Sequence, residues 1–249
     1  MKQHINLNDF STNPEEEITK DDVQQKNLKL LENLIDIQNK LFAQRKYSVL
    51  VVLQGMDTSG KDGAVKHVFS GLNPMGCNVT AFKKPSEEEA AHHFLWRINK
   101  VCPAKGYFHI FNRSYYEDIL VPYVNKSLNE SELNDRCDEI NMFEKGLINN
   151  NTIIFKFYLH VSHKEQIERL NERKTDAHKR WKYQKEDVIA IAMHKEYKKA
   201  YNFLFEKCSK SAPWHIVPSD KKWYKNYMIL YEIVKKLEKY EIDYPVIKI

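Results

Sequence analysis

The sequence predicts an α/β protein with a three-layer α/β/α arrangement around a mainly parallel sheet of five strands. Short runs rich in β-branched and aromatic residues alternate with amphipathic stretches along the chain, and this alternation is typical of a parallel sheet covered by helices. The run from Ser48 to Leu53 is apolar after its first residue, as expected for a strand buried on both faces. A glycine-framed turn and a helical pattern follow this strand directly.

Length and composition favour one domain spanning residues 1–249. The formal net charge of +5 is modest for this length, so the charge alone does not indicate a nucleic-acid partner. The four cysteines are scattered without a CxxC pair, which indicates reduced thiols. The longest unbroken apolar run, Val49 to Leu53, is too short to span a bilayer. We therefore expect a cytoplasmic protein with neither a membrane nor a nucleic acid as its partner.

The N-terminal part is predicted to contain a flexible arm and one long helix. Residues 1–18 are polar and aperiodic, which favours a loosely held arm. Thr19 and Asp22 form a capping box, and the apolar pattern after them predicts a helix to about Arg45. After the first strand and its turn, a second helix is expected to end near Gly71.

The remaining elements are predicted from apolar runs and helix caps. Strands are expected at 77–82, 107–111, 152–159 and 214–217, with helices at 86–98, 132–148, 187–207 and 219–240. Ser86 with Glu89 caps the first of these helices, and Ser162 with Glu165 caps a further helix that follows the fourth strand. In such a sheet, ligands bind at the carboxyl ends of the strands.

The turn after the first strand has the form GxxxxGK, which is typical of a phosphate-binding loop. Its backbone N–H groups can surround a phosphate while the Lys61 ammonium reaches the outer oxygens. The expected phosphate-binding positions are Gly55, Thr58, Ser59, Gly60 and Gly63. Asp62 stands where a Ser or Thr hydroxyl commonly holds Mg²⁺.

Acidic residues near this loop indicate a metal-rich phosphate site. Asp57 and Asp62 would repel a polyanion unless divalent cations lie between them, and we expect Mg²⁺, with Mn²⁺ as an alternative. The segment after the third strand brings Glu117 and Asp118 to the same edge of the sheet. The alternative is an ordinary acidic pair in the first turn of a helix. Arg113 can grip a phosphate or pair with Glu117.

A basic stretch at about 169–187 is predicted to form a helical lid. From Arg169 to Lys185 the chain holds seven Lys or Arg residues against two acids. Lid closure would bring arginines onto a transferring phosphoryl group and exclude water. A solvated surface segment is the alternative interpretation. Trp181 could anchor the closed lid or stack on a base, and anchoring is favoured.

Five ordered motifs resemble the polyphosphate kinase 2 family over about residues 25–245. They are GMDTSGKDG, VFSGLNPMGCNVTAFKKPSEEE, FNRSYYEDILV, KTDAHKRWKY and APWHIVPSDKKWYKN. The resemblance implies a P-loop kinase-like fold and phosphoryl transfer between inorganic polyphosphate and a nucleotide. It also implies a homodimer or homotetramer.

The resemblance assigns roles to individual residues. It matches the family's loop, strand-end and lid positions to Asp57, Lys61, Asp62, Lys83, Arg113, Glu117, Asp118, Arg173, Lys179 and Lys182. The RSxYED form, with Glu117 where another subgroup has Asn, is similar to the branch that phosphorylates both nucleoside mono- and diphosphates. Ala177 replaces the usual lid proline and Gln184 a usual serine, which leaves details of the lid open.

The leading hypothesis is therefore a Mg²⁺-dependent phosphotransferase acting on polyphosphate with AMP, ADP and ATP, and with guanine nucleotides as further candidates. Its expected catalytic residues are Asp57, Lys61, Arg113, Asp118 and Arg173, and its expected metal ligands are Asp57, Asp62 and Asp118. One alternative is an ATP-dependent nucleotide kinase of the same fold, which Asp62 disfavours. The other is a non-enzymatic module that binds RNA or another polyanion.

Overall fold

The computed structural model describes residues 5–246, and its five strands form one parallel sheet. The strand order is β2-β3-β1-β4-β5, with β1 at Ser48–Gln54, β2 at Cys77–Ala81, β3 at Phe108–Asn112, β4 at Thr152–His160 and β5 at Trp214–Pro218. Val49 pairs with Phe108 on one side and with Ile153 on the other. The predicted α/β class and parallel five-stranded sheet are confirmed.

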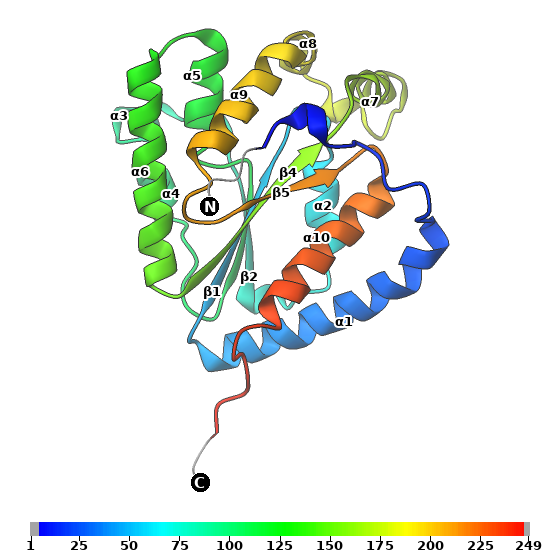
Figure 1. Cartoon of the computed structure of the whole chain (residues 1–249), viewed down its shortest axis with the longest axis vertical. Helices are drawn as coiled ribbons and strands as arrows, with labels where there is room; N and C mark the ends of the chain where they lie inside the picture. Colours follow the sequence, from blue (N-terminus) through cyan, green and yellow to red (C-terminus); the bar gives the residue numbers. More distant parts are fainter. Residues whose placement is uncertain (1–4, 247–249) are drawn as a thin grey trace.

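Helices cover both faces of this sheet (Figure 1). Their bounds are α1 Lys20–Gln44, α2 Lys61–Val68, α3 Glu87–Ala91, α4 Trp96–Asn99, α5 Glu117–Asn125, α6 Glu130–Asn149, α7 His163–Thr175, α8 Lys185–Ala192, α9 His194–Lys207 and α10 Lys222–Leu237. Three short 3-10 turns lie at Leu7–Asp9, Pro74–Gly76 and Arg180–Lys182. Among the described residues, no helix combines the length and the apolar character needed to cross a bilayer.

Alternate residues of β1 enter two separate hydrophobic cores. Val49, Val51 and Leu53 pack with residues of α1, α2 and α10, whereas Leu50 and Val52 pack with residues of α5, α6 and α9. All seven residues of β1 are buried, which explains why its sequence lacks polar alternation. This double burial fixes the strand whose carboxyl end carries the glycine-rich loop.

Several helix ends follow the predicted caps, and two predicted helices are broken. The capping box of Thr19 with Asp22 begins α1, and Ser86 with Glu89 begins α3. The helix expected at 86–98 stops at Ala91, because His92 adopts extended backbone angles. The helix expected at 187–207 is divided into α8 and α9 at Met193. Helix α5, after the third strand, was not predicted as a separate element.

The prediction of a loosely held arm at 1–18 is wrong for its described part. Ile5 and Leu7 are 4% and 1% exposed, and the Leu7 amide donates to Asn202 Oδ1 at 3.0 Å. Thr12 Oγ1 donates to Asp220 Oδ2 at 2.8 Å. Polar composition concealed two apolar anchors, which tie this segment to the carboxyl ends of β4 and β5 (Figure 1). Residues 1–4 lie outside the described range.

Candidate active site

The glycine-rich loop makes a tight turn between β1 and α2. Gly60 has φ +95°, in the left-handed region that favours glycine. A Cβ on Gly55 would lie 2.7 Å from Ser59 Oγ and 2.9 Å from the Leu159 carbonyl oxygen. Thr58 has φ 63°, which is an uncommon conformation for a β-branched residue and one that functional loops often hold. The GxxxxGK spacing therefore corresponds to a strained turn that opens onto the N-terminus of α2.

Lys61 begins α2 and turns back into the loop. Its Nζ donates to the carbonyl oxygens of Gly55 at 2.6 Å and Met56 at 3.1 Å. Burial, with a further contribution from the nearby Arg113 charge, lowers the pKa of Lys61 to about 8. A phosphate in the loop would favour the charged ammonium, so this group is suited to respond to a bound anion.

Three side chains that the sequence does not indicate as functional donate hydrogen bonds to backbone carbonyl groups of the loop. Arg169 Nη1 donates to the Thr58 carbonyl at 2.9 Å, and Lys225 Nζ donates to the Gly60 carbonyl at 2.7 Å. Gln166 Nε2 donates to the Asp57 carbonyl at 2.8 Å. Arg169 was counted only as part of the basic stretch, and Lys225 stands in the late SDKKWYKN motif, which was the available signal.

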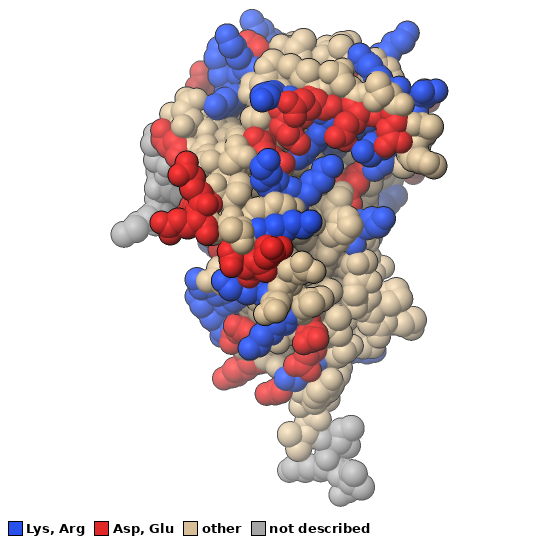
Figure 2. Space-filling model, turned by 90° about the vertical axis from the view of Figure 1, so that its right-hand side faces the viewer, with Lys and Arg blue, Asp and Glu red and all other residues tan. Residues whose placement is uncertain are grey.

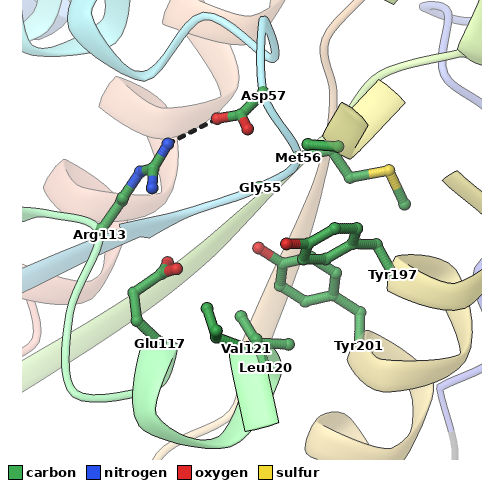
Figure 3. A pocket seen from close by; sticks show the side chains of 10 residues that line it. Gly55, Met56, Asp57, Arg113, Glu117, Leu120, Val121, Tyr197 and Tyr201 are labelled. Atoms are coloured by element: carbon green, nitrogen blue, oxygen red, sulfur yellow. Dashed lines mark hydrogen bonds and ion pairs between the residues drawn. The ribbon is translucent and has the colours of Figure 1, made fainter. Parts of the chain in front are cut away.

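A pocket lies at the carboxyl ends of β1 and β3, between α5 and α9 (Figure 3). Its charged end contains Arg113, whose Nη2 donates to Asp57 Oδ1 at 2.6 Å, with Glu117 beside this pair. Its other end is apolar and aromatic, formed by Met56, Leu120, Val121, Ala190, Tyr197 and Tyr201. The sequence predicts the charged residues, but nothing in it distinguishes these two tyrosines from the other tyrosines, of which the chain has 14 in all. The pocket lining thus combines a charged end with an apolar and aromatic end.

Charges within the pocket are tightly balanced. Burial lowers the pKa of Arg113, but the Glu117 and Asp57 carboxylates outweigh burial and raise it overall. Burial raises the pKa of Glu117, and the Arg113 and Lys61 charges oppose that rise. Arg113 also has φ 64°, an uncommon conformation for a non-glycine residue. Its guanidinium bonds Asp57, and among the described residues it forms no ion pair with Glu117, the partner that the sequence suggested.

Asp62 connects the loop helix to the strand end and the basic stretch. Asn112 Nδ2 donates to Asp62 Oδ1, and Lys182 Nζ donates to Oδ2, both at 2.9 Å. Burial raises the pKa of Asp62, but these two hydrogen bonds outweigh burial and lower it overall. Two residues expected to act at the site, Asp62 and Lys182, are thus brought together from positions 120 residues apart.

Asp118 and Lys83 meet a different partner, Arg97. Arg97 Nη2 lies 3.5 Å from Asp118 Oδ2, and Arg97 Nη1 donates to the Lys83 carbonyl at 2.9 Å. Burial raises the pKa of Asp118, while Arg97 and Arg136 oppose that rise. Lys83 itself is exposed. The residue that sequence reasoning missed is Arg97, a buried arginine on the short helix α4.

The expected metal ligands do not form one cluster. Across residues 5–246, no three His, Cys, Asp or Glu side chains come together in a way that could hold a metal ion. Asp57 and Asp62 both belong to the loop region, whereas Asp118 pairs with Arg97. A metal at the loop would therefore be held by Asp57 or Asp62 together with oxygens of the bound phosphates, and the residues present fit that arrangement.

The basic stretch is stabilised by acids within and next to it. Arg173 Nη1 donates to Asp187 Oδ2 at 2.6 Å. Lys179 Nζ lies 3.0 Å from Glu172 Oε2 and 3.4 Å from Asp176 Oδ2. Acidic and basic side chains are interspersed on the face shown in Figure 2. Lys182 alone among the three expected lid residues contacts the loop region, while Arg173 and Lys179 pair inside the stretch.

Comparisons with known proteins agree with this geometry. The family model for polyphosphate kinase 2 matches residues 17–245. An AMP/ADP-polyphosphate phosphotransferase of Meiothermus ruber is 40% identical over 210 residues, covering 84% of this chain and 79% of the relative. An ADP-polyphosphate phosphotransferase of Rhodopseudomonas palustris is 36% identical over 228 residues, covering 86% and 79%.

A solved structure is similar over almost the whole chain. The crystal structure of polyphosphate kinase 2 from Arthrobacter aurescens TC1 has a TM-score of 0.91 and 38% identity, and the match covers 96% of this chain and 86% of that one. The range matched by the family model, 17–245, includes the glycine-rich loop, the strand-end segment and the basic stretch. On these grounds the chain belongs to the polyphosphate kinase 2 family.

Proposed function

We propose that this protein transfers a phosphoryl group between inorganic polyphosphate and nucleoside mono- and diphosphates, so that AMP yields ADP and ADP yields ATP. The observation that supports this most strongly is the pocket in which Asp57, Arg113 and Glu117 adjoin the phosphate loop. The 40% identical relative carries the name AMP/ADP-polyphosphate phosphotransferase, which agrees with acceptance of both nucleotides. Guanine nucleotides are further candidate acceptors.

The loop would hold the phosphoryl group in transfer. Phosphoryl transfer needs positioning and neutralisation of charge, and the attacking oxygen belongs to the acceptor phosphate, so no protein nucleophile is required. Lys61 and the backbone N–H groups at the start of α2 would stabilise the charge that develops on the equatorial oxygens. Arg113 would exchange its bond with Asp57 for a bidentate grip on phosphate.

Charge balance supports a requirement for a divalent metal ion, and we propose Mg²⁺. Around the loop, the carboxylates of Asp57, Asp62 and Glu117 lie near Lys61, Arg113 and Lys182 and offset part of their charge, while Arg169 and Lys225 donate to loop carbonyl groups. A polyphosphate and a nucleotide would together bring more negative charge than remains to be balanced by these cations. Mg²⁺ bound by Asp57 or Asp62 and by phosphate oxygens would supply that compensation.

The aromatic end of the pocket would hold the acceptor nucleoside. Tyr197 and Tyr201 line the pocket opposite the ion pair of Arg113 with Asp57 (Figure 3). An acceptor nucleotide lying between the tyrosines and the ion pair would present its phosphate toward Arg113, while its base would contact the aromatic rings. Glu117 lies on the acceptor side and would help to admit a monophosphate.

Closure of the segment at about 169–187 would complete the site. Lys182 already contacts Asp62, and Arg173 and Lys179 would exchange their acidic partners for phosphate oxygens when substrate is bound. Closure would also exclude water as a competing acceptor. We propose in addition a homodimer or homotetramer in the cytoplasm, which light scattering and cell fractionation can test.

A product profile tests the proposed function. The protein, Mg²⁺ and long-chain polyphosphate are incubated separately with AMP, ADP, GMP and GDP, and nucleotides are separated by anion-exchange chromatography. We expect ADP from AMP and ATP from ADP. Parallel reactions replace polyphosphate with ATP as the donor for AMP. Product from ATP but not from polyphosphate would identify an ATP-dependent kinase, and no product from any pair would reject phosphotransferase activity.

A further inference from the structure

A second pocket lies beside the phosphate loop but shares no lining residue with the first. It is an open pocket lined by the N-terminal segment from Leu7 to Thr12, the end of β4, the start of α7 and the N-terminal part of α9. The N-terminal segment is fixed there by the Leu7 amide bond to Asn202 and the Thr12 bond to Asp220. The anchored segment thus forms one wall of the pocket.

The ionisable side chains that line this pocket are histidine and lysine. They are His160, His163, His194 and Lys198, and no Asp or Glu side chain is among the lining residues. Asp220, whose charge acts on His160 from outside the lining, accepts from Thr12 Oγ1 and from the Ser162 amide. The His163 and His194 ring centroids lie 4.8 Å apart. Because no carboxylate lines the pocket, the electrostatic potential inside it becomes more positive when one of these histidines is protonated.

His160 provides independent evidence for a ligand. Its side chain is 5% exposed and lines the pocket. The Leu7 and Phe10 backbone carbonyls lie near the ring and act to raise its pKa, yet within residues 5–246 no group meets its Nδ1 with hydrogen-bond geometry. Buried polar atoms in folded proteins are nearly always paired, because an unpaired one costs about 1–3 kcal/mol. An oxygen of a bound molecule in the pocket would satisfy this nitrogen.

From these contacts we propose that the second pocket is a binding site for a phosphate-bearing anion, separate from the phosphate loop. His160, His163 and Lys198 would donate hydrogen bonds to the phosphate oxygens. The N-terminus of the 13-residue helix α7, which begins at His163 after the Ser162 cap, adds a favourable dipole. The anion could be the end of a polyphosphate chain or a phosphomonoester, and both present the same chemistry.

One side chain connects this pocket to the phosphate loop. His194 Nδ1 lies 2.6 Å from Gln166 Oε1, and Gln166 Nε2 donates to the Asp57 carbonyl at 2.8 Å. Since the Gln166 amide nitrogen is used at Asp57, its oxygen must accept from His194 Nδ1–H. Thr58 Oγ1 also donates to the Gln166 backbone carbonyl at 3.3 Å. An anion that displaces His194 would therefore alter the contacts of two loop residues, Asp57 and Thr58.

Protonation should accompany binding of the anion. Burial, together with the His163, Lys198 and His160 charges, lowers the pKa of His194 to about 4. Burial and Lys198 likewise lower the pKa of His160, against opposing contributions from Asp220 and from backbone carbonyls of the N-terminal segment. A bound anion offsets the repulsion among these cations and raises both pKa values. Binding should consequently tighten as the pH falls from 8 to 6.

The direct test follows the histidine rings of the full-length protein by NMR with ¹⁵N-histidine labelling. Tripolyphosphate, orthophosphate and AMP are titrated in turn at pH 6 and pH 8, with sodium chloride at matched ionic strength as the control. The titrations are repeated on Lys61→Ala to weaken binding at the loop. We expect saturable shifts of the His160, His163 and His194 rings that persist in Lys61→Ala. Preference among the three probes identifies the source of the phosphate.

The proposal is overturned if no ring shifts, if sodium chloride reproduces the shifts, or if they disappear in Lys61→Ala. A matched pair of surface variants on α9 sharpens the test. Lys198→Gln should weaken binding on the order of tenfold, as loss of one charge-assisted hydrogen bond predicts, whereas Lys199→Gln on the same helix should bind as the parent does. Equal affinity in both variants would also contradict the assignment. None of these readouts requires phosphotransferase activity.

Discussion

Three cationic side chains in this protein donate to the backbone of the loop. Lys61, Arg169 and Lys225 all donate to carbonyl oxygens between Gly55 and Gly60. Each such bond holds a loop carbonyl group toward the cation and so fixes the orientation of that peptide group. The three cations thus fix the loop conformation before substrate arrives, which is how preorganised sites stabilise developing charge.

Replacing Lys61 tests its role in phosphoryl transfer. Lys61→Ala removes the ammonium that lies within the loop, and we expect turnover to fall on the order of 10²-fold or more. Steady-state rates with polyphosphate and ADP provide the measurement. Lys66→Ala, an exposed lysine one turn later on α2, is the matched control and should retain activity. A fully active Lys61→Ala protein would remove Lys61 from the proposed mechanism.

Lys225 makes a prediction about stability and pH. Burial, with repulsion from the Arg169 and Lys222 charges, lowers its pKa to about 7 from the ordinary 10.5, so between pH 7 and 10.5 the unfolded chain holds this proton more tightly than the folded one. In that window Lys225 makes the folded state more stable as pH rises, by up to about 1.4 kcal/mol per pH unit. Below pH 7 this dependence vanishes.

Chemical denaturation of the parent and Lys225→Met at several pH values measures this effect. The difference in free energy of unfolding, parent minus variant, should grow from pH 7 to pH 9 and stay constant from pH 5.5 to 6.5. A constant difference across the whole range would show that Lys225 keeps an ordinary pKa in the folded protein.

At the level of elements, the segment between α7 and α8 is held by two unequal ion pairs. Arg173 and Asp187, whose side chains are 21% and 10% exposed, join α7 to α8. Lys182 and Asp62, 33% and 60% exposed, join the segment to α2. Because exposed pairs contribute little, the internal pair should define the shape of the segment while the outer pair can open and close.

Hydrogen–deuterium exchange can compare these two pairs. Asp187→Asn should speed exchange of backbone amides over both 176–184 and α8, whereas Lys182→Gln should affect 176–184 less and leave α8 unchanged. Lys164→Gln, an 87% exposed lysine on α7, serves as the control. Faster exchange of α8 in Lys182→Gln than in Asp187→Asn would contradict the proposal that the Arg173–Asp187 pair stabilises the segment more than the Lys182–Asp62 pair does.

A buried ion pair supports the segment that leads into α5. Lys156 Nζ on β4 lies 2.9 Å from Glu144 Oε2 on α6, and both side chains are fully buried. Tyr115 Oη donates to Glu144 Oε1 at 2.8 Å, and Tyr116 donates to the same oxygen. These two tyrosines lie between Arg113 and Glu117 in the sequence. The network therefore fixes the backbone that carries the charged end of the active-site pocket.

Breaking this pair should be costly. Lys156→Met leaves the Glu144 charge buried without its partner, and we expect a loss of about 3–5 kcal/mol in free energy of unfolding, measured by urea denaturation. Lys210→Met, which breaks an exposed pair with Asp138, should cost less than about 1 kcal/mol. Similar losses in the two variants would contradict the distinction between buried and exposed pairs.

For the whole molecule, the fold was predictable where burial acts along one segment. The β1 run is predicted as a buried strand because each of its apolar residues enters one of two cores, and the caps of α1 and α3 use residues three positions apart. Breaks at His92 and Met193 were not predictable from local pattern. The anchoring of Ile5 and Leu7 depends on contacts with residues nearly 200 positions away, which no local signal contains.

In the candidate site too, some features were predictable from the sequence and others depend on tertiary contacts. The GxxxxGK spacing predicted the loop and Lys61, and the carboxyl-end rule brought Arg113 and Glu117 to it. Which partner each charge takes was set by tertiary structure: Arg113 bonds Asp57, and Asp118 meets Arg97 instead of the expected metal ligands. Arg169 and Lys225 act through carbonyl groups, for which sequence has no side-chain signature.

The central claim, that polyphosphate donates a phosphoryl group to a nucleotide at this loop, can be measured most directly by isotope transfer. The protein is given Mg²⁺, ³²P-labelled polyphosphate and unlabelled AMP, and the ADP formed is isolated and cleaved to locate the label. We expect label in the β-phosphoryl group of ADP, formed without added ATP and lost in Lys61→Ala. Absence of labelled ADP, or undiminished label transfer by Lys61→Ala, would contradict the account.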